Sequence, residues 1–127
     1  MRLLSVFAVA TIVVVTAPAN AATGPAGLPI PLNCSGSEPF WGLTIRDADV
    51  AAFTWDNQRT HWHIQSIGTA MMRPTTWRVT FKGEGRHALI FKEASGCSDA
   101  DSDPPPEYSL LLEDGAGLLQ GCCSAGD

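Results

Sequence analysis

The sequence predicts an all-β protein, a small antiparallel barrel or sandwich of about seven to eight short strands linked by disulfides. Apolar and polar residues alternate with period two along several runs, and clusters of Gly, Pro, Asn and Asp separate these runs. No stretch keeps a helical period for three turns. The 127 residues suit a single domain, and 45% of them are hydrophobic against 17% charged, which excludes a wholly disordered chain.

The first segment is predicted to be a signal peptide over residues 1–21. Arg2 is followed by an uncharged run over residues 3–15, which is shorter than the roughly 20 residues that a membrane span needs. The stretch A-N-A at residues 19–21 then matches the small-x-small pattern of a signal peptidase site. We therefore expect an exported chain, periplasmic or secreted, with no membrane span after cleavage.

Residues 22–32 contain three prolines and little apolar surface to bury, so the sequence predicts a flexible leader there. A single all-β domain is expected over residues 33–127. Nothing in the sequence indicates an internal repeat or a second domain.

Seven strands can be assigned within that domain from the alternation alone. The clearest covers residues 76–82, where Trp77, Val79 and Phe81 share one face and polar side chains share the other. The full set of expected strands is 41–46, 50–55, 61–67, 76–82, 87–93, 108–113 and 117–122.

Residues 94–107 form the longest irregular stretch of the domain. Three consecutive prolines begin at Pro104, and because proline has no backbone N–H to donate to a strand ladder, this stretch is expected to be a loop or an edge. A loop of this length in a compact domain is often functional.

The cysteine count indicates crosslinks. An even number of cysteines in an exported chain predicts a disulfide framework, and the four present allow three pairings. One pairing needs a strained bridge between the neighbours Cys122 and Cys123, whereas the other two join Cys34 and Cys97 separately to this pair. A zinc site is disfavoured, because the sequence has no pair of C-x₂-C knuckles.

Two patterns resemble metal sites but are interpreted otherwise. His61 and His63 would share one face of a strand, where His87 could join them, but Trp62 and Ile64 take the opposite, core-facing side. The histidines are therefore expected to face solvent.

Asp99, Asp101 and Asp103 resemble the opening of a calcium loop. The sixth position is Pro104 where Gly is required, and the twelfth is Leu110 where Glu is required. We therefore expect a solvated acidic loop, with no metal and no cofactor.

Charge and motifs argue against two function classes, nucleic-acid binders and enzymes with a known catalytic motif. A formal net charge of −5 with only eight Lys and Arg argues against nucleic-acid binding. The chain has neither a G-x-S-x-G elbow nor an H-E-x-x-H motif, and its cysteines are assigned to crosslinks. A non-catalytic protein is the expectation.

Residues 34–41, which read C-S-G-S-E-P-F-W, resemble the G-x-E-P-F-W signature of an uncharacterised family of small exported bacterial proteins. Members are often described as lipoproteins or membrane proteins. The C-S-D of residues 97–99, Ser102-Asp103 and the G-C-C of residues 121–123 resemble the family's C-terminal C-x-D-G-M-S-D and G-C patterns. Here Ala100-Asp101 replaces Gly-Met and Pro104 replaces Arg.

The resemblance implies an exported all-β fold and a particular disulfide pattern. Many family members carry only the counterparts of Cys97 and of the first C-terminal cysteine. The resemblance therefore implies the pair Cys97–Cys122, which leaves Cys34 to pair with Cys123. Neighbouring strand residues face opposite ways, which lets Cys122 and Cys123 serve partners on different sides.

With those disulfides, the two motifs would be anchored at one short stretch of the last strand. An aromatic wall and convergent polar groups are typical of a ligand pocket. Trp41 is expected to plug one end of the barrel, while Glu38 is either structural or in contact with ligand. The expected ligand-binding residues are Glu38, Phe40, Trp41, Ser102 and Asp103.

The sequence therefore predicts an exported non-catalytic binding or envelope-associated domain, with a small ligand or an envelope protein as partner. One alternative is an inhibitor of a basic cell-wall hydrolase such as lysozyme, docked through its acidic surface. Another is a small enzyme that uses Glu38.

Overall fold

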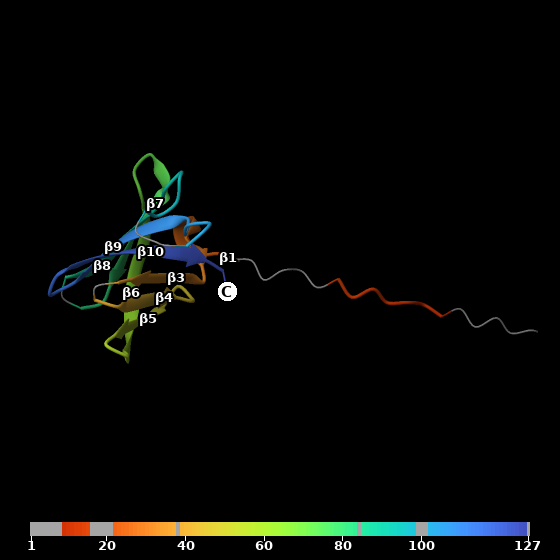
Figure 1. Cartoon of the computed structure of the whole chain (residues 1–127), viewed down its shortest axis with the longest axis horizontal. Coiled ribbons are helices and arrows are strands. Elements are labelled where there is room, and N and C mark those ends of the chain that lie inside the picture. Colours follow the sequence, from red (N-terminus) through yellow and green to blue (C-terminus); the bar gives the residue numbers. More distant parts are fainter. Residues whose placement is uncertain (1–8, 16–21, 38, 84, 99–101, 127) are drawn as a thin grey trace, which may run out of the picture.

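The structure is a computed structural model that describes residues 9–15, 22–37, 39–83, 85–98 and 102–126. Eight antiparallel strands close a barrel in the order β10-β3-β4-β5-β6-β7-β8-β9 (Figure 1). They are β3 (Leu32–Gly36), β4 (Trp41–Ile45), β5 (Val50–Trp55), β6 (Gln58–Ala70), β7 (Arg73–Phe81), β8 (Arg86–Lys92), β9 (Tyr108–Asp114) and β10 (Leu118–Ala125). The predicted all-β, disulfide-linked fold is confirmed, as a barrel and not as a sandwich.

Each of the seven expected strands is present, and the range 50–55 matches β5 at both ends. The barrel strand that the sequence did not predict is β3, which pairs with both β4 and β10 and so closes the barrel. Its last three residues belong to the cysteine motif that begins at Cys34, and its asparagine, serine and glycine weaken the apolar alternation. Strand β6 is longer than expected because it continues past the barrel into a ribbon with β7.

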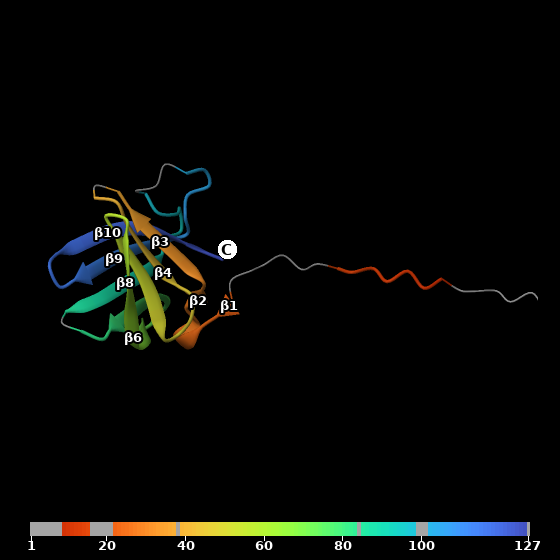
Figure 2. The ribbon, with the colours of Figure 1, turned by 90° about the horizontal axis from the view of Figure 1, so that it is seen from below.

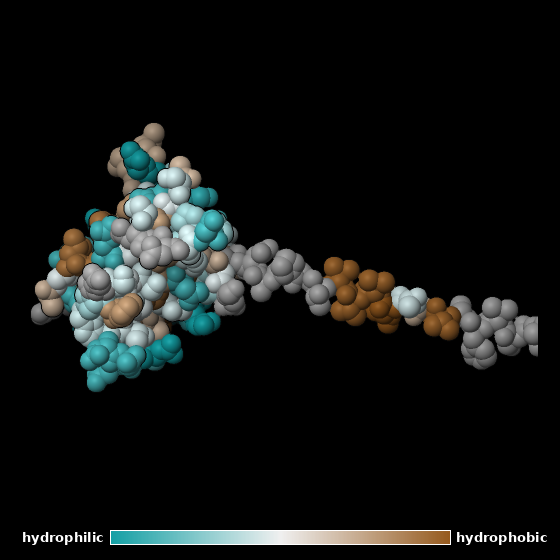
Figure 3. Space-filling model, viewed as in Figure 1, coloured by the Kyte–Doolittle hydropathy of each residue, from teal (hydrophilic) through white to brown (hydrophobic). Residues whose placement is uncertain are grey.

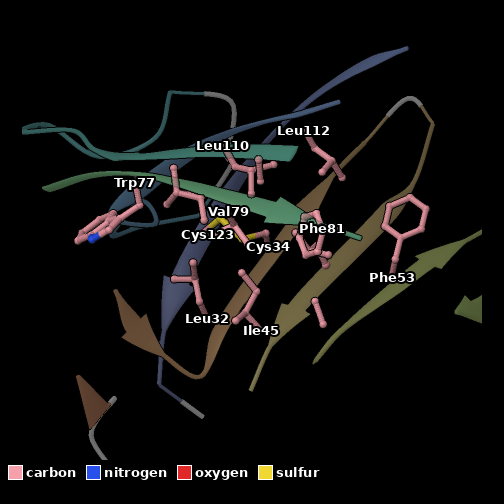
Figure 4. Close-up of a cluster of buried hydrophobic side chains, with 14 of the residues drawn as sticks. Leu32, Cys34, Ile45, Phe53, Trp77, Val79, Phe81, Leu110, Leu112 and Cys123 are labelled. Atoms are coloured by element: carbon pink, nitrogen blue, oxygen red, sulfur yellow. A yellow bond between two sulfur atoms is a disulfide. The ribbon is translucent and has the colours of Figure 1, made fainter. Parts of the chain in front are cut away.

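Alternate residues of every barrel strand point inward and form one core (Figure 4). Leu32, Ile45, Val79 and Leu112 are fully buried, and burial of such a side chain stabilises the fold by about 1.5–3 kcal/mol. The Cys34–Cys123 disulfide lies inside this core among the apolar side chains.

Two short hairpins show the turn chemistry that the barrel uses. Asp56 and Asn57 connect β5 to β6, with φ values of 50° and 61°, in the left-handed region that Asp and Asn tolerate. At the far end of β6, Met71 and Met72 make the connection to β7, and both side chains are almost fully exposed.

Residues 22–32, where the sequence predicts a flexible leader with little to bury, contain paired strands and a buried side chain. Strand β1 (Ala22–Thr23) pairs with β2 (Pro29–Ile30), and the 3₁₀ turn η1 (Pro25–Gly27) lies between them (Figure 2). Leu28 is fully buried in the core. The Trp77 indole Nε1 donates a hydrogen bond to the backbone carbonyl of Ala26 at 2.9 Å. The prolines suggested flexibility, but the side chains between them complete the core.

Residues 9–15 belong to the predicted signal peptide and lie in an extended segment away from the barrel (Figures 1 and 3). Their apolar side chains are exposed, and Val9 is 87% exposed. The remaining predicted signal residues, 1–8 and 16–21, lie outside the described residues. In the described part of the chain, no helix has the length and apolarity needed to cross a membrane.

Candidate functional site

The Cys97–Cys122 disulfide attaches the segment between β8 and β9 to the outer surface of the barrel. Cys122 faces outward from β10, and Cys97 is buried against it. The Cys97 backbone N–H donates to the Pro106 carbonyl at 2.8 Å, and the Glu93 N–H donates to the Glu107 carbonyl at 3.1 Å. These bonds hold both ends of the segment beside β9 and β10.

The base of this segment also affects a tyrosine at the start of β9. Burial raises the pKa of Tyr108 above its ordinary value, and the adjacent Glu107 carboxylate adds to the shift through its charge and a hydrogen bond. Tyr108 also packs against Trp77 with ring centroids 5.9 Å apart. The segment is therefore joined to the core at its C-terminal end.

Trp41 fills one end of the barrel, in agreement with its expected role, and is 5% exposed. Its indole lies over Gly36 and Gly121, where a Cβ atom at Gly121 would approach the ring carbon Cζ2 to 2.7 Å. The two glycines thus leave the space that the indole occupies. Phe40 precedes Trp41, yet it is 82% exposed.

A hollow of about 830 Å³ lies on the outer face of β3 and β10, next to the attached segment. We call it the β3–β10 hollow. Figure 2 shows the β3–β4 turn and the segment before β9 at the same edge of the barrel. Its lining residues are Asn33, Ser35, Gly36, Ser37, Phe40, Trp41, Ser102, Pro106, Gln120, Gly121, Cys122 and Ser124.

This hollow brings together three of the five predicted ligand-binding residues, Phe40, Trp41 and Ser102. Asp103 is exposed and does not line it. Glu38 lies outside the described residues. The polar floor from β3 and β10 was missed by sequence reasoning, because outward serines and amides in a strand look like ordinary solvated positions.

A second hollow of about 580 Å³ lies over β4 and β5, and we call it the β4–β5 hollow. It shares Phe40 and Trp41 with the first. Trp55, at the end of β5, lines it and is 40% exposed. Sequence reasoning missed Trp55, although a large aromatic residue directly before a tight turn was an available signal. The other lining residues are Pro39, Gly42, Thr54, Asp56 and Asn57.

The described residues that line the two hollows carry little charge. Among the described residues that line them, none is Lys, Arg or His, and the single carboxylate is that of Asp56. Hydroxyl and amide side chains supply most of the polar groups. Such a lining can donate and accept hydrogen bonds, but it offers no cation to an anionic ligand.

A row of aromatic rings supports this end of the barrel from within. The Phe53 ring stacks on Trp62 at 4.2 Å and lies 6.4 Å from the Trp55 ring, and Trp62 in turn contacts Phe81 at 5.3 Å. The Arg86 guanidinium lies 4.8 Å from the centre of the Trp62 ring. The Trp55 ring is therefore linked to the packed aromatic rings of the core through Phe53.

The predicted outward direction of the histidines is confirmed. His61 and His63 are exposed, whereas Trp62 and Ile64 are buried on the other face of β6. His87 faces Glu113 across β8 and β9, with 3.3 Å between Nε2 and Oε2.

No cluster of three or more His, Cys, Asp or Glu side chains that could hold a metal occurs among the residues the structure describes. Asp99 and Asp101, the first two residues of the calcium-like pattern, lie outside them.

Comparison with known proteins adds no further information: no family model, no curated protein and no solved structure matches the chain. The resemblance to the exported G-x-E-P-F-W family therefore stays a prediction based on the two motifs.

Proposed function

We propose that this chain is an exported, non-catalytic binding domain whose ligand occupies the β3–β10 hollow. The observation that carries the proposal is the convergence of distant segments on one hollow of about 830 Å³, with Phe40 from the β3–β4 turn and Ser102 from the segment before β9. Ligand sites in proteins commonly measure about 300–1,000 Å³ and combine aromatic walls with a few polar groups.

Export is supported by the crosslinks and the N-terminal run. All four cysteines are paired, in the bonds Cys34–Cys123 and Cys97–Cys122. Disulfides form and persist in oxidising compartments. Together with the uncharged run over residues 3–15, this favours a periplasmic or secreted location, either free or associated with the cell envelope.

Native mass spectrometry of the full chain, expressed with its export signal and purified gently, tests the proposal. We expect a non-covalently bound small molecule on the wild-type protein and its loss in the Phe40→Ala variant, whose exposed side chain the fold does not need. A Met71→Ala variant, which changes an equally exposed side chain far along the β6–β7 ribbon, should keep the bound mass. Unliganded wild-type protein, or an adduct that persists in Phe40→Ala, would contradict the proposal.

A second proposal is inhibition of a basic cell-wall hydrolase such as lysozyme. It is supported by the net charge of −5 and by the exposed side chains of Asp103 and Glu107 on the segment before β9, because opposite charge steers association. A cell-wall turbidity assay should then show slower lysis with the protein present and recovery at high salt. Unchanged lysis would remove this proposal. Catalysis by Glu38, the third possibility, rests on the sequence alone.

A further inference from the structure

The two hollows form one track across the barrel end. They share Phe40 and Trp41, and the strands beneath them are neighbours in the order β10-β3-β4-β5. Phe40 lines both of them and is 82% exposed, and no ring packs against it among the described contacts. A ligand long enough to reach both hollows would pass directly over this ring.

The side chains that line the two hollows indicate which kind of ligand would fit them. Exposed faces of Phe40 and Trp55 offer apolar, polarisable surface, while Ser35, Thr54 and Asn57 offer neutral hydroxyl and amide groups. A ring that has apolar C–H faces and hydroxyl groups along its edge matches both kinds of surface. That description fits a sugar.

Other ligand classes fit less well. No Lys, Arg or His among the described residues lines either hollow, so a phosphate or carboxylate group would have no charge partner there. A peptide has no open edge to join as an added strand at β3, β4 or β5, because each of these strands is already paired on both sides. A quaternary ammonium would use the aromatic rings and Asp56, but it would leave the hydroxyl and amide groups unused.

We infer that the ligand of this domain is a neutral oligosaccharide, with one sugar stacked on Phe40 and its neighbours in the two hollows. This inference rests on the proposed function and names the class of its ligand. The role of Trp55 is to wall the β4–β5 hollow, where its ring stacks with that of Phe53. Chains of sugars are therefore expected to bind more tightly than the single sugar, because only a chain reaches both hollows.

The test is calorimetric titration of the full chain with chito-, cello- and malto-oligosaccharides, each compared with its own monosaccharide. At least one oligosaccharide should bind, and its monosaccharide should bind more weakly. Phe40→Ala should weaken that binding about tenfold, from loss of the stacking contact. Melting temperature should stay unchanged, because the removed ring is exposed.

Two glycines can be replaced by a larger side chain as a matched test and control. A Cβ at Gly42 would lie 3.7 Å from the Cys34 carbonyl oxygen, in ordinary contact, so a larger side chain can extend into the β4–β5 hollow. Nothing lies within 4 Å of a Cβ at Gly68, which lines neither hollow. Gly42→Leu should therefore reduce oligosaccharide affinity to that of a shorter sugar, while Gly68→Leu should leave it unchanged.

The outcomes separate this inference from the proposed function. If no oligosaccharide binds but native mass spectrometry still shows a Phe40-dependent adduct, the oligosaccharide inference is wrong and the proposed binding function stands. Phe40-dependent binding of choline or of a proline-rich peptide, without sugar binding, would do the same. Oligosaccharide binding that survives both Phe40→Ala and Gly42→Leu would overturn the site. Absence of both sugar binding and any adduct would overturn both proposals.

Discussion

Cys122 and Cys123 are neighbours in β10, yet they form disulfides on opposite faces of the sheet. Cys123 points into the barrel and bonds to Cys34 of β3 within the core. Cys122 points outward and bonds to Cys97 of the segment before β9. Two adjacent residues therefore have different roles. Cys123 crosslinks the strands that close the barrel, and Cys122 attaches the surface segment that lines the β3–β10 hollow.

This arrangement predicts different losses for the two disulfides. Replacing Cys97 and Cys122 together by Ala should weaken ligand binding at the β3–β10 hollow, because Ser102 and Pro106 lose their attachment, and should lower stability by about 2–4 kcal/mol. Replacing Cys34 and Cys123 should lower stability more, because this bond spans 89 residues against 25 and lies in the core. Urea unfolding of the two double variants measures both stability losses, and native mass spectrometry measures the bound ligand. Equal stability losses with equal binding would contradict the separation of roles.

The space beneath the Trp41 indole gives a second prediction. Gly121→Ala should destabilise the protein by about 1–3 kcal/mol, because the new methyl group overlaps the indole and the carbonyl of Ser35. Gly36→Ala should behave in the same way, since its Cβ would meet the indole Nε1. Gly42→Ala is the control in a neighbouring strand, with a change expected within about 0.5 kcal/mol. If all three variants unfold at the same urea concentration, Trp41 does not need this space.

The packing of the segment before β3 gives a third prediction. Leu28→Ala should lower the free energy of unfolding by about 2–5 kcal/mol, because its side chain is fully buried. Leu118→Ala, at a leucine that is 67% exposed, should change it by less than about 0.5 kcal/mol. Hydrogen exchange over residues 22–30 should accelerate in the first variant. If the two leucine variants are equally stable, Leu28 does not contribute to the core, and residues 22–32 behave as the flexible leader that the sequence predicts.

Titration of Tyr108 predicts a loss of stability in alkali. Its pKa is raised in the folded protein above 10.0, first by burial and then by Glu107, so the fold disfavours the ionised form. The contribution of Tyr108 to the free energy of unfolding should therefore be fully present below the unfolded pKa of about 10 and be lost as pH rises through the folded pKa. In Tyr108→Phe the loss of stability in alkali should be smaller. Because other groups titrate in both proteins, the difference between the two urea series isolates Tyr108, and parallel curves would refute the assignment.

The sequence by itself determined what depends on the local direction of side chains in a strand. The inward Trp77, Val79 and Phe81 and the outward His61 and His63 follow from the two-residue period, which holds wherever a strand forms. The disulfide pattern came from the motif resemblance, and spacing alone left two pairings open.

Only the tertiary structure decided what depends on contacts between distant segments. The pairing of Cys34 with Cys123 across β3 and β10 closes the sheet into a barrel, and it joins residues 89 apart in sequence. Leu28 is buried because it joins the core of this closed barrel, and Phe40 and Ser102 line one hollow because the outer disulfide attaches the segment before β9 to β10. Local alternation carries no information about either contact, since it records only which face a side chain takes and not which strand or loop covers that face.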